Sequence, residues 1–212
     1  MDAALRESLH ATFGFSEFRA GQQPAIESLL AGQDTLIVMP TGSGKSLIYQ
    51  LAALNLSGLT VVVSPLIALM KDQVDSLTAC RAPATFVNST LSPAEQAARL
   101  SDVAAGRVKL LYVAPERLRN AAFLAALEGC QIGLLAVDEA HCISHWGHDF
   151  RPDYLHIAGF RQHAGVPVVA ALTATATRRV QDDIEQQLAM RAGARDHWLQ
   201  PPESDLRGAV RL

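Results

Sequence analysis

Short runs of apolar residues alternate along the chain with longer segments in which apolar residues return every three or four positions. A short continuous apolar run is typical of a strand buried on both faces of a parallel sheet. The longer segments have the spacing of amphipathic helices. We therefore expect six strands, at residues 35–39, 59–63, 84–88, 109–113, 132–137 and 166–172. This alternation predicts an α/β fold with a mostly parallel sheet and helices on both faces.

Helices are predicted at residues 44–55, 65–79, 92–106, 115–129 and about 178–190. Ser92 has the side chain of an N-cap, Pro93 takes the first helical position, and Glu95 completes a capping-box pattern. Gly106 and Gly129 lie where glycine often ends a helix. The cap signals and the apolar pattern therefore agree on where these helices begin and end.

The composition is that of a globular protein, because 49% of the 212 residues are hydrophobic and 18% are charged. This length suits one sizeable domain, which we place at residues 1–200. Residues 201–212, which begin Pro-Pro-Glu-Ser, are expected to start a linker. A formal net charge of −3 gives no overall attraction for nucleic acid. Any binding of a phosphate backbone therefore needs a local basic surface.

The chain has three cysteines, Cys80, Cys130 and Cys142. An odd number without C-x-x-C spacing indicates reduced thiols in a cytoplasmic protein rather than a disulfide framework. The N-terminus lacks the basic and apolar regions of a signal peptide. The longest apolar stretch, residues 59–70, is interrupted by Ser64 and Pro65 and cannot span a bilayer. We expect a cytoplasmic protein, in a bacterial cytosol or nucleoid, with no membrane partner.

A loop of small residues follows the first predicted strand and leads directly into a helix. Its residues are Pro40, Thr41, Gly42, Ser43, Gly44, Lys45 and Ser46. Such a loop lets backbone N–H groups point at phosphate oxygens, and the helix N-terminus adds partial positive charge. Lys45 can reach the β- and γ-phosphates of a nucleotide, and the Ser46 hydroxyl can hold Mg²⁺. Met39 replaces the first glycine of the strict pattern, so the match is to the variant T-G-x-G-K-S, and the alternative is a plain Gly/Ser turn.

Two acidic residues, Asp138 and Glu139, directly follow the fifth predicted strand. The carboxyl ends of parallel strands are where α/β sheets bind ligands. Asp138 would bind Mg²⁺, directly or through water, and Glu139 would polarise the water that attacks the γ-phosphate. The alternative is a helix cap or a solvated turn.

A different metal site is also open at the sequence level. His141, Cys142, His145 and His148 lie within eight residues, and all four could be zinc ligands. Gly147 and the short spacings between these residues fit structural zinc patterns poorly. The magnesium interpretation of Asp138 is therefore favoured over a structural zinc site.

Six segments, taken in order, resemble the first RecA-like motor domain of RecQ-type DNA helicases, in helicase superfamily 2. The segments are FGFSEFRAGQQPAI, MPTGSGKSLIYQ, VVVSPLIALMKDQV, LLYVAPERL, LLAVDEAHCISHWGHDFRPDY and ALTATAT. The resemblance extends from about Leu9 to about Leu188. Its tract HWGHDFRP is similar to the aromatic-rich loop that distinguishes this family. The resemblance implies a P-loop NTPase fold.

The resemblance also implies roles for individual residues around ATP. Gln22 would read the adenine edge, and Arg19 and Phe15 would flank the ring, although tyrosine is common where this chain has Phe15. The phosphates would lie against Thr41, Gly42, Ser43, Gly44, Lys45 and Ser46, and Mg²⁺ against Ser46 and Asp138. The implied catalytic residues are Lys45, Asp138, Glu139 and His141. The alternative for Phe15 is packing of a helix against the sheet.

A further set of residues is implied in binding DNA or in coupling that binding to ATP hydrolysis. It comprises Ser64, Pro65, Lys71, Trp146, His148, Phe150, Arg151, Thr173 and Thr175. Trp146 and Phe150 would stack on bases, and Arg151 would meet a phosphate. His145 replaces the Gln or Glu that is usual at that place. Trp146 could instead fill a groove between this domain and a neighbour.

The function implied by the resemblance is that of an ATP-dependent 3′-to-5′ DNA helicase of recombination and repair, acting on single-stranded or forked DNA. Such a motor needs a second RecA-like lobe with an arginine finger. We expect that lobe to follow residue 212, and the isolated chain to be weakly active as a fragment. The alternatives are a lobe of a DEAD/DEAH-type RNA helicase and a non-catalytic ATP- or DNA-binding module.

Overall fold

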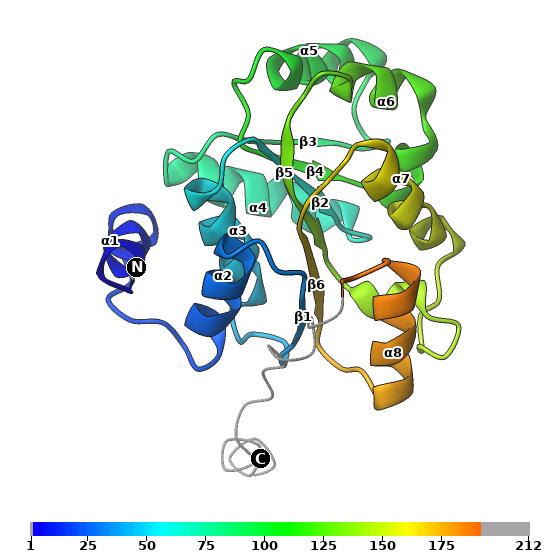
Figure 1. Ribbon diagram of the computed structural model, residues 1–212. Helices are drawn as coiled ribbons and strands as arrows, with labels where there is room; N and C mark the ends of the chain where they lie inside the picture. The colour runs from blue at the N-terminus through cyan, green and yellow to red at the C-terminus, as the bar shows by residue number, and fades with distance from the viewer. Residues whose placement is uncertain (1, 192–212) are drawn as a thin grey trace.

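The computed structural model describes residues 2–191 and folds them around one sheet (Figure 1). The strands are β1 (Thr35–Val38), β2 (Leu59–Val63), β3 (Ala84–Val87), β4 (Leu110–Val113), β5 (Ile132–Val137) and β6 (Val169–Thr173). Their order is β1-β6-β5-β2-β4-β3, and all neighbouring pairs are parallel. The predicted α/β class is confirmed, and the described sheet is wholly rather than mostly parallel.

Helices cover both faces of this sheet. One face is covered by α1 (Asp2–Phe13), α2 (Gln22–Leu30), α3 (Lys45–Asn55) and α4 (Ile67–Ala79). The other face is covered by α5 (Pro93–Ala104), α6 (Ala121–Leu127), α7 (Ile157–His163) and α8 (Arg178–Gln187). Three short 3₁₀ helices, η1 (Pro115–Arg119), η2 (Ala140–Ile143) and η3 (Pro152–His156), lie on this second side.

The strands supply the core of each layer by alternation. In β1, Leu36 and Val38 point to the face covered by α5–α8, whereas Ile37 points to the face covered by α1–α4. Because successive side chains of a strand point to opposite faces, a strand covered on both sides must be apolar throughout. This explains why the strands appear in the sequence as continuous apolar runs.

All six predicted strands are present, with small shifts at their ends. The last begins at Val169 rather than at residue 166, because Pro167 has no N–H to donate to the ladder. The capping box is confirmed, since the Ser92 N–H donates to Glu95 Oε2 (2.8 Å) and the Glu95 N–H donates to Ser92 Oγ (3.3 Å).

The single helix predicted at residues 115–129 is wrong. The chain forms η1 and then α6, and Asn120 between them is extended and accepts a hydrogen bond from the Phe123 N–H (2.9 Å). An asparagine that caps a new helix interrupts the old one. Sequence reasoning also missed α1, α2 and α7. Among the described residues, no helix has both the length and the apolar character needed to span a bilayer. The predicted linker at residues 201–212 lies outside the described residues.

Candidate functional site

The carboxyl ends of β1 and β5 form the site, and only β6 lies between these two strands. The loop after β1 leads into α3, and Asp138 and Glu139 follow β5. The Met39 N–H donates to the Thr173 carbonyl at the end of β6 (3.1 Å), so the ends of β1 and β6 are held together. Neighbouring strands are about 4.8 Å apart, so the phosphate loop and the acidic pair lie within about two strand spacings.

Two glycines give the loop its path. Gly42 has φ 81° and Gly44 has φ 84°, a left-handed conformation that other residues rarely adopt. A Cβ atom on Gly44 would lie 2.6 Å from Gln22 Nε2. Glycine at residue 44 therefore satisfies both the backbone conformation and the close approach of α2.

Lys45 is the first residue of α3 and turns back across the loop. Its Nζ donates to the carbonyls of Met39 (2.9 Å) and Pro40 (3.2 Å). Burial lowers the pKa of Lys45, while the nearby carboxylates of Glu139 and Asp138 act in the opposite direction. The ammonium group is thus held between the loop and the acidic pair.

Asp138 is partly buried and accepts two weak or local hydrogen bonds. Its Oδ1 accepts from the Glu139 N–H (3.0 Å), and its Oδ2 accepts from Ser64 Oγ (3.4 Å). Burial raises the pKa of Asp138, and the negative charge of Glu139 adds to that effect. A carboxylate in this position gains from an added cation, because its own environment disfavours the charge.

Glu139 has φ 49°, a left-handed conformation that is costly for a residue with a side chain. Its Oε2 lies 3.2 Å from His141 Nδ1. The hydrogen bond from His141 is the largest influence on the pKa of Glu139, which is lowered despite partial burial. Glu139 is therefore held in one direction and kept ionised.

His141 joins the acidic pair to the end of β6. Its Nδ1 lies 2.9 Å from Thr173 Oγ1, and Thr173 Oγ1 donates to the Thr175 carbonyl (3.1 Å). The threonine hydroxyl has a single proton, so it accepts from a proton on His141 Nδ1. His141 thus contacts the Thr173 side chain, and Thr173 in turn contacts the backbone of Thr175.

The phosphate loop, Lys45 and the acidic pair share one open cleft of about 300 Å³. Its lining includes Thr41, Gly42, Gly44, Lys45, Ser46, Ser64, Asp138 and Glu139, and also Tyr49, Leu66, Leu69, Met70, Gln73 and Tyr112. Ser43 Oγ is buried without a hydrogen-bond partner among the described residues. An unpartnered hydroxyl in the loop, a nearby ammonium group and an enclosed carboxylate suit a bound phosphate together with a divalent cation.

A smaller hollow of about 150 Å³ lies beside the loop. It is lined by Phe15, Glu17, Arg19, Gln22, Gly44 and Leu47. The Gln22 amide is held in place, because its Oε1 accepts from the Arg19 N–H (2.9 Å) and its Nε2 donates to the Gly44 carbonyl (3.1 Å). Phe15 is 53% exposed, so it does not pack a helix against the sheet. The three residues implied in adenine binding thus line one hollow next to the phosphate loop.

Three residues of the segment that follows β2 are implied in DNA contact, namely Ser64, Pro65 and Lys71. They lie in different places. Ser64 is buried and hydrogen-bonded to Asp138, so it belongs to the cleft that Lys45 and Asp138 line. Lys71 lies on the exposed side of α4 and forms an ion pair with Asp75. Pro65 directly follows Ser64 at the end of β2, where it leads to α4.

The aromatic loop, residues 144–151, presents one exposed aromatic side chain. Trp146 is 59% exposed, and the Arg179 guanidinium carbon lies 3.2 Å from its ring centroid. Phe150 is instead stacked on His145, with ring centroids 3.8 Å apart. Each ring therefore has one face covered, Trp146 by Arg179 and Phe150 by His145, and Trp146 is the one with a largely exposed side chain.

The two other implied residues of the loop also have partners. His148 stacks on His141 with ring centroids 4.5 Å apart, which links the loop directly to the acidic pair. Arg151 Nη2 donates to Asp149 Oδ2 (2.9 Å).

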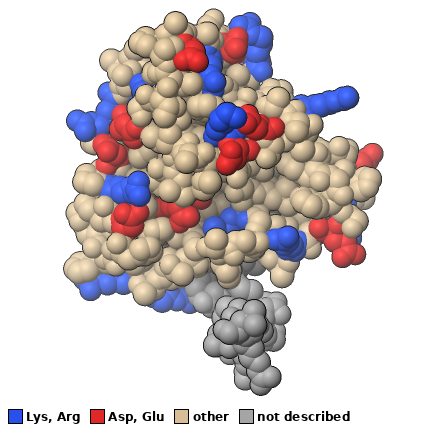
Figure 2. Space-filling view, turned by 180° about the vertical axis from the view of Figure 1, so that it is seen from behind, with Lys and Arg blue, Asp and Glu red and all other residues tan. Residues whose placement is uncertain are grey.

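Charged side chains on one face of the described part of the molecule are of both signs and interspersed with uncharged residues (Figure 2).

Sequence reasoning missed two residues that hold the site. Arg179 on α8 covers Trp146, and the Tyr154 hydroxyl donates to the Asp138 carbonyl (2.9 Å). Tyr154 is fully buried. Arg179 lies far along the chain from Trp146, and no local pattern marks that contact. The Tyr in HDFRPDY was the available signal for Tyr154.

The comparison with family models matches residues 19–184 to the DEAD/DEAH box helicase family. The chain belongs to this family. The match covers the phosphate loop, the acidic pair and the Thr173–Thr175 segment of the helicase domain. The wholly parallel sheet and the paired strand ends are consistent with it.

Relatives of this helicase domain include RecQ DNA helicases. It is 51% identical to "ATP-dependent DNA helicase RecQ" of Bacillus subtilis over 178 residues, which cover 83% of this chain and 30% of the relative. It is 45% identical to the protein of the same name in Pasteurella multocida over 184 residues, which cover 87% of this chain and 29% of the relative. The chain therefore spans less than a third of the length of these relatives.

Solved structures place the fold among RecA-like helicase domains. The Pyrococcus furiosus Hef helicase domain matches with a TM-score of 0.66 at 22% identity, over 92% of this chain and 40% of that one. Mycobacterium smegmatis helicase Lhr, solved with single-stranded DNA and AMP-PNP, matches with a TM-score of 0.68 at 22% identity, over 87% of this chain and 26% of that one. At this level of identity the likeness concerns the fold alone.

Proposed function

We propose that this helicase domain is the first of two motor lobes of an ATP-dependent DNA helicase, which uses Mg²⁺ and moves 3′ to 5′ on single-stranded or forked DNA during recombination and repair. The observation that carries the proposal is the single cleft shared by the phosphate loop and the acidic pair. The 45–51% identity to RecQ DNA helicases supports DNA rather than RNA as the substrate.

The chain's own groups would bind and orient the triphosphate. Backbone N–H groups of the loop and the N-terminus of α3 would hold the phosphates, and Lys45 would leave its two carbonyl partners to meet the β- and γ-phosphates. Ser46 and Asp138 would hold Mg²⁺, which neutralises phosphate charge when bound. The adenine would enter the hollow beside Phe15 and Gln22.

Glu139 would orient the attacking water and accept its proton. The hydrogen bond from His141 suits this role, because it fixes the carboxylate and keeps it in the ionised form that can accept a proton. The γ-phosphoryl group would pass to that water, and ADP would leave. The arginine that completes such a site belongs to a second lobe.

Coupling to DNA would run through the aromatic loop. Trp146 would stack on a base, and a shift of the loop would reach Glu139 through the stacked rings of His148 and His141. Thr173 would pass the same change to β6. This chain of contacts is continuous from the exposed loop to the water-activating carboxylate.

Fluorescent ATP analogues, titrated into the chain with and without Mg²⁺, test the nucleotide half of the proposal. We expect binding that strengthens with Mg²⁺ and is lost in Lys45→Ala. In the full-length protein, we expect hydrolysis that single-stranded DNA stimulates more than RNA does. Equal stimulation by RNA would favour an RNA helicase, and binding without any hydrolysis would favour a non-catalytic module.

A further inference from the structure

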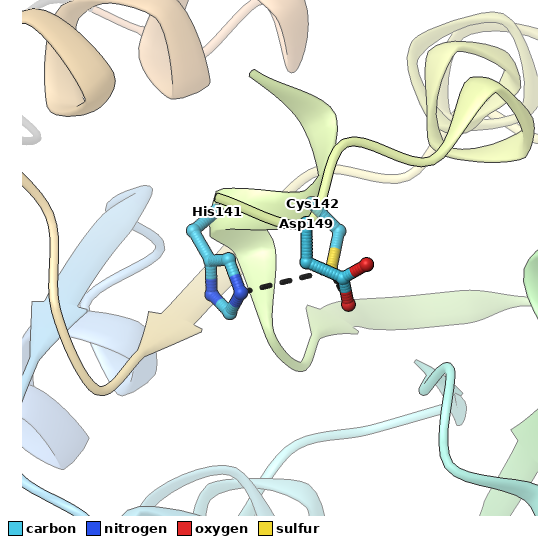
Figure 3. Close-up of side chains that lie close together, drawn as sticks. All are labelled: His141, Cys142 and Asp149. Carbon is cyan, nitrogen blue, oxygen red and sulfur yellow. Dashed lines mark hydrogen bonds between the residues drawn. The ribbon is translucent and has the colours of Figure 1, made fainter. Parts of the chain in front are cut away.

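Three side chains next to the acidic pair gather around one point, and the proposed ATP mechanism uses only one of them, His141. They are His141, Cys142 and Asp149, and one ligand atom from each lies within 4.8 Å of the other two (Figure 3). Cys142 Sγ is 3.8 Å from His141 Nε2 and 3.8 Å from Asp149 Oδ2. Within the described residues, no other group of at least three His, Cys, Asp or Glu side chains shows such an arrangement.

We propose that these three side chains form a binding site for a thiophilic divalent cation such as Zn²⁺, separate from the magnesium site at Ser46 and Asp138. Tetrahedral zinc has Zn–S of about 2.3 Å and Zn–N of about 2.0–2.1 Å, which places ligand sulfur and nitrogen about 3.6 Å apart. The observed separation of 3.8 Å is close to that value. Three ligands leave a fourth position open for a water, as in catalytic zinc sites.

The surroundings orient two of the three ligands. His141 Nδ1 donates toward Thr173 Oγ1 and Glu139 Oε2, so Nε2 is the nitrogen left for a metal. A histidine whose other nitrogen is bonded to a carboxylate is a common zinc ligand. Arg151 holds Asp149 through Oδ2, which fixes the carboxylate while its positive charge opposes a cation. The thiolate and the carboxylate supply the two negative charges that offset it.

Two of the three ligands are buried, and the third lies at the surface. His141 is 6% exposed and Cys142 is fully buried, whereas Asp149 lies at the surface. Burial, with a smaller effect of Asp149, raises the pKa of the Cys142 thiol to about 12, so the thiol stays protonated until a metal displaces the proton into solvent. A cation would enter from the side of Asp149.

The location gives the site a consequence. Cys142 lies in η2, next to His141, and Asp149 lies in the aromatic loop. A cation bound to both would tie the loop to the acidic pair. We expect Zn²⁺ to restrain the loop without competing with Mg²⁺. This site differs from the four-residue set His141, Cys142, His145 and His148, because His145 is stacked on Phe150 and η2 ends at Ile143.

Cobalt(II) titration of the chain tests the site without ATP or DNA, so its failure is independent of the proposed function. We expect a thiolate-to-cobalt charge-transfer band in the near ultraviolet for the unchanged chain, and for Cys80→Ser and Cys130→Ser. The band should vanish in Cys142→Ser. In Asp149→Asn the cobalt affinity should fall at least about tenfold.

Asp149→Asn changes a surface residue and guards against the case in which Cys142→Ser fails to fold. Zn²⁺ should also raise the melting temperature of the unchanged chain and not that of Asp149→Asn. An unchanged band in Cys142→Ser, or equal cobalt affinity in Asp149→Asn, would overturn the site. Loss of the band in His145→Ala with normal affinity in Asp149→Asn would move it to the four-residue set and likewise overturn it.

Discussion

Two aspartates lie at opposite ends of the parallel strands, one before β1 and one after β5, and their surroundings differ. Asp34 comes before β1 and is 1% exposed. It accepts from Arg161 Nη2 (2.9 and 2.8 Å), from the Val169 N–H (2.9 Å) and from the Arg191 N–H (2.7 Å). Asp138 follows β5 and has only the Glu139 N–H and Ser64 Oγ.

The pKa values of the two aspartates move in opposite directions. Burial alone would raise the pKa of Asp34, but the hydrogen bonds from Arg191, Arg161 and Val169 outweigh it and hold the pKa below its ordinary value. Burial raises the pKa of Asp138, and Glu139 adds to it. A satisfied carboxylate stabilises a fold, whereas an unsatisfied one at a strand end is available to a ligand.

The largest expected effect is on ATP hydrolysis at the strand ends near Asp138. Lys45→Ala and Asp138→Asn in the full-length protein should each lower kcat about 1,000-fold, because each removes charge stabilisation of the transferring phosphate. Steady-state ATPase assays with saturating DNA measure this. Asp34→Asn, compared at a temperature where it stays folded, is the matched control and should keep kcat within about threefold.

The next effect is on the stability of the fold, through the contacts of Asp34. Asp34→Asn should lower the free energy of unfolding by about 3 kcal/mol or more near pH 7, because it leaves Arg161 buried without its carboxylate. Folding lowers the pKa of Asp34. The stability that Asp34 contributes is therefore present above its ordinary pKa of 3.8, and it is lost as the pH falls through the pKa that Asp34 has in the folded protein. The difference between unchanged and variant chains in urea unfolding should therefore shrink below about pH 4. A difference that is independent of pH would contradict this assignment.

A third prediction concerns the loop beside Asp138. Trp146→Ala in the full-length protein should leave ATP affinity unchanged and weaken the binding of single-stranded DNA by about 10-fold or more, since base stacking is worth about 1–3 kcal/mol. DNA-stimulated hydrolysis should fall with it. Leu155→Ala, which removes another exposed apolar side chain (39% exposed), is the control and should change neither. Normal stimulation in Trp146→Ala would refute the coupling role of the loop.

The smallest effect is a gain in stability. Asp138→Asn should raise the melting temperature of the nucleotide-free chain near neutral pH. The expected gain in the free energy of unfolding is about 1 kcal/mol or less. Because folding raises the pKa of Asp138, ionising this group costs stability as the pH rises through the pKa that Asp138 has in the folded protein. The gain should therefore disappear below the ordinary pKa of 3.8. Destabilisation at neutral pH would show that Asp138 is a structural residue like Asp34.

The two aspartates also show what a sequence can reveal. Asp138 could be predicted because it follows an apolar strand and the chain also contains a phosphate loop. Asp34 could not, because its partners Arg161 and Arg191 lie more than a hundred residues away and the sequence gives no sign of these pairs. The same limit applies to Trp146, whose exposure was expected and whose partner Arg179 was not.

Local patterns accounted for the strands for a similar physical reason. A strand covered on both faces is apolar at every position, so β1–β6 stand out in the sequence. The break at Asn120 did not, since an asparagine within an amphipathic stretch is compatible with one helix or with two. The position of Asp149 beside Cys142 depends on how the loop folds back, which residue spacing does not determine.

The most direct test of the central claim is a crystal structure of the chain with Mg²⁺ and a non-hydrolysable ATP analogue. We expect the triphosphate between Lys45 and the Asp138–Glu139 pair, Mg²⁺ against Ser46 and Asp138, and adenine in the hollow beside Gln22. A nucleotide bound elsewhere on the domain, or a triphosphate that does not approach Asp138, would contradict it.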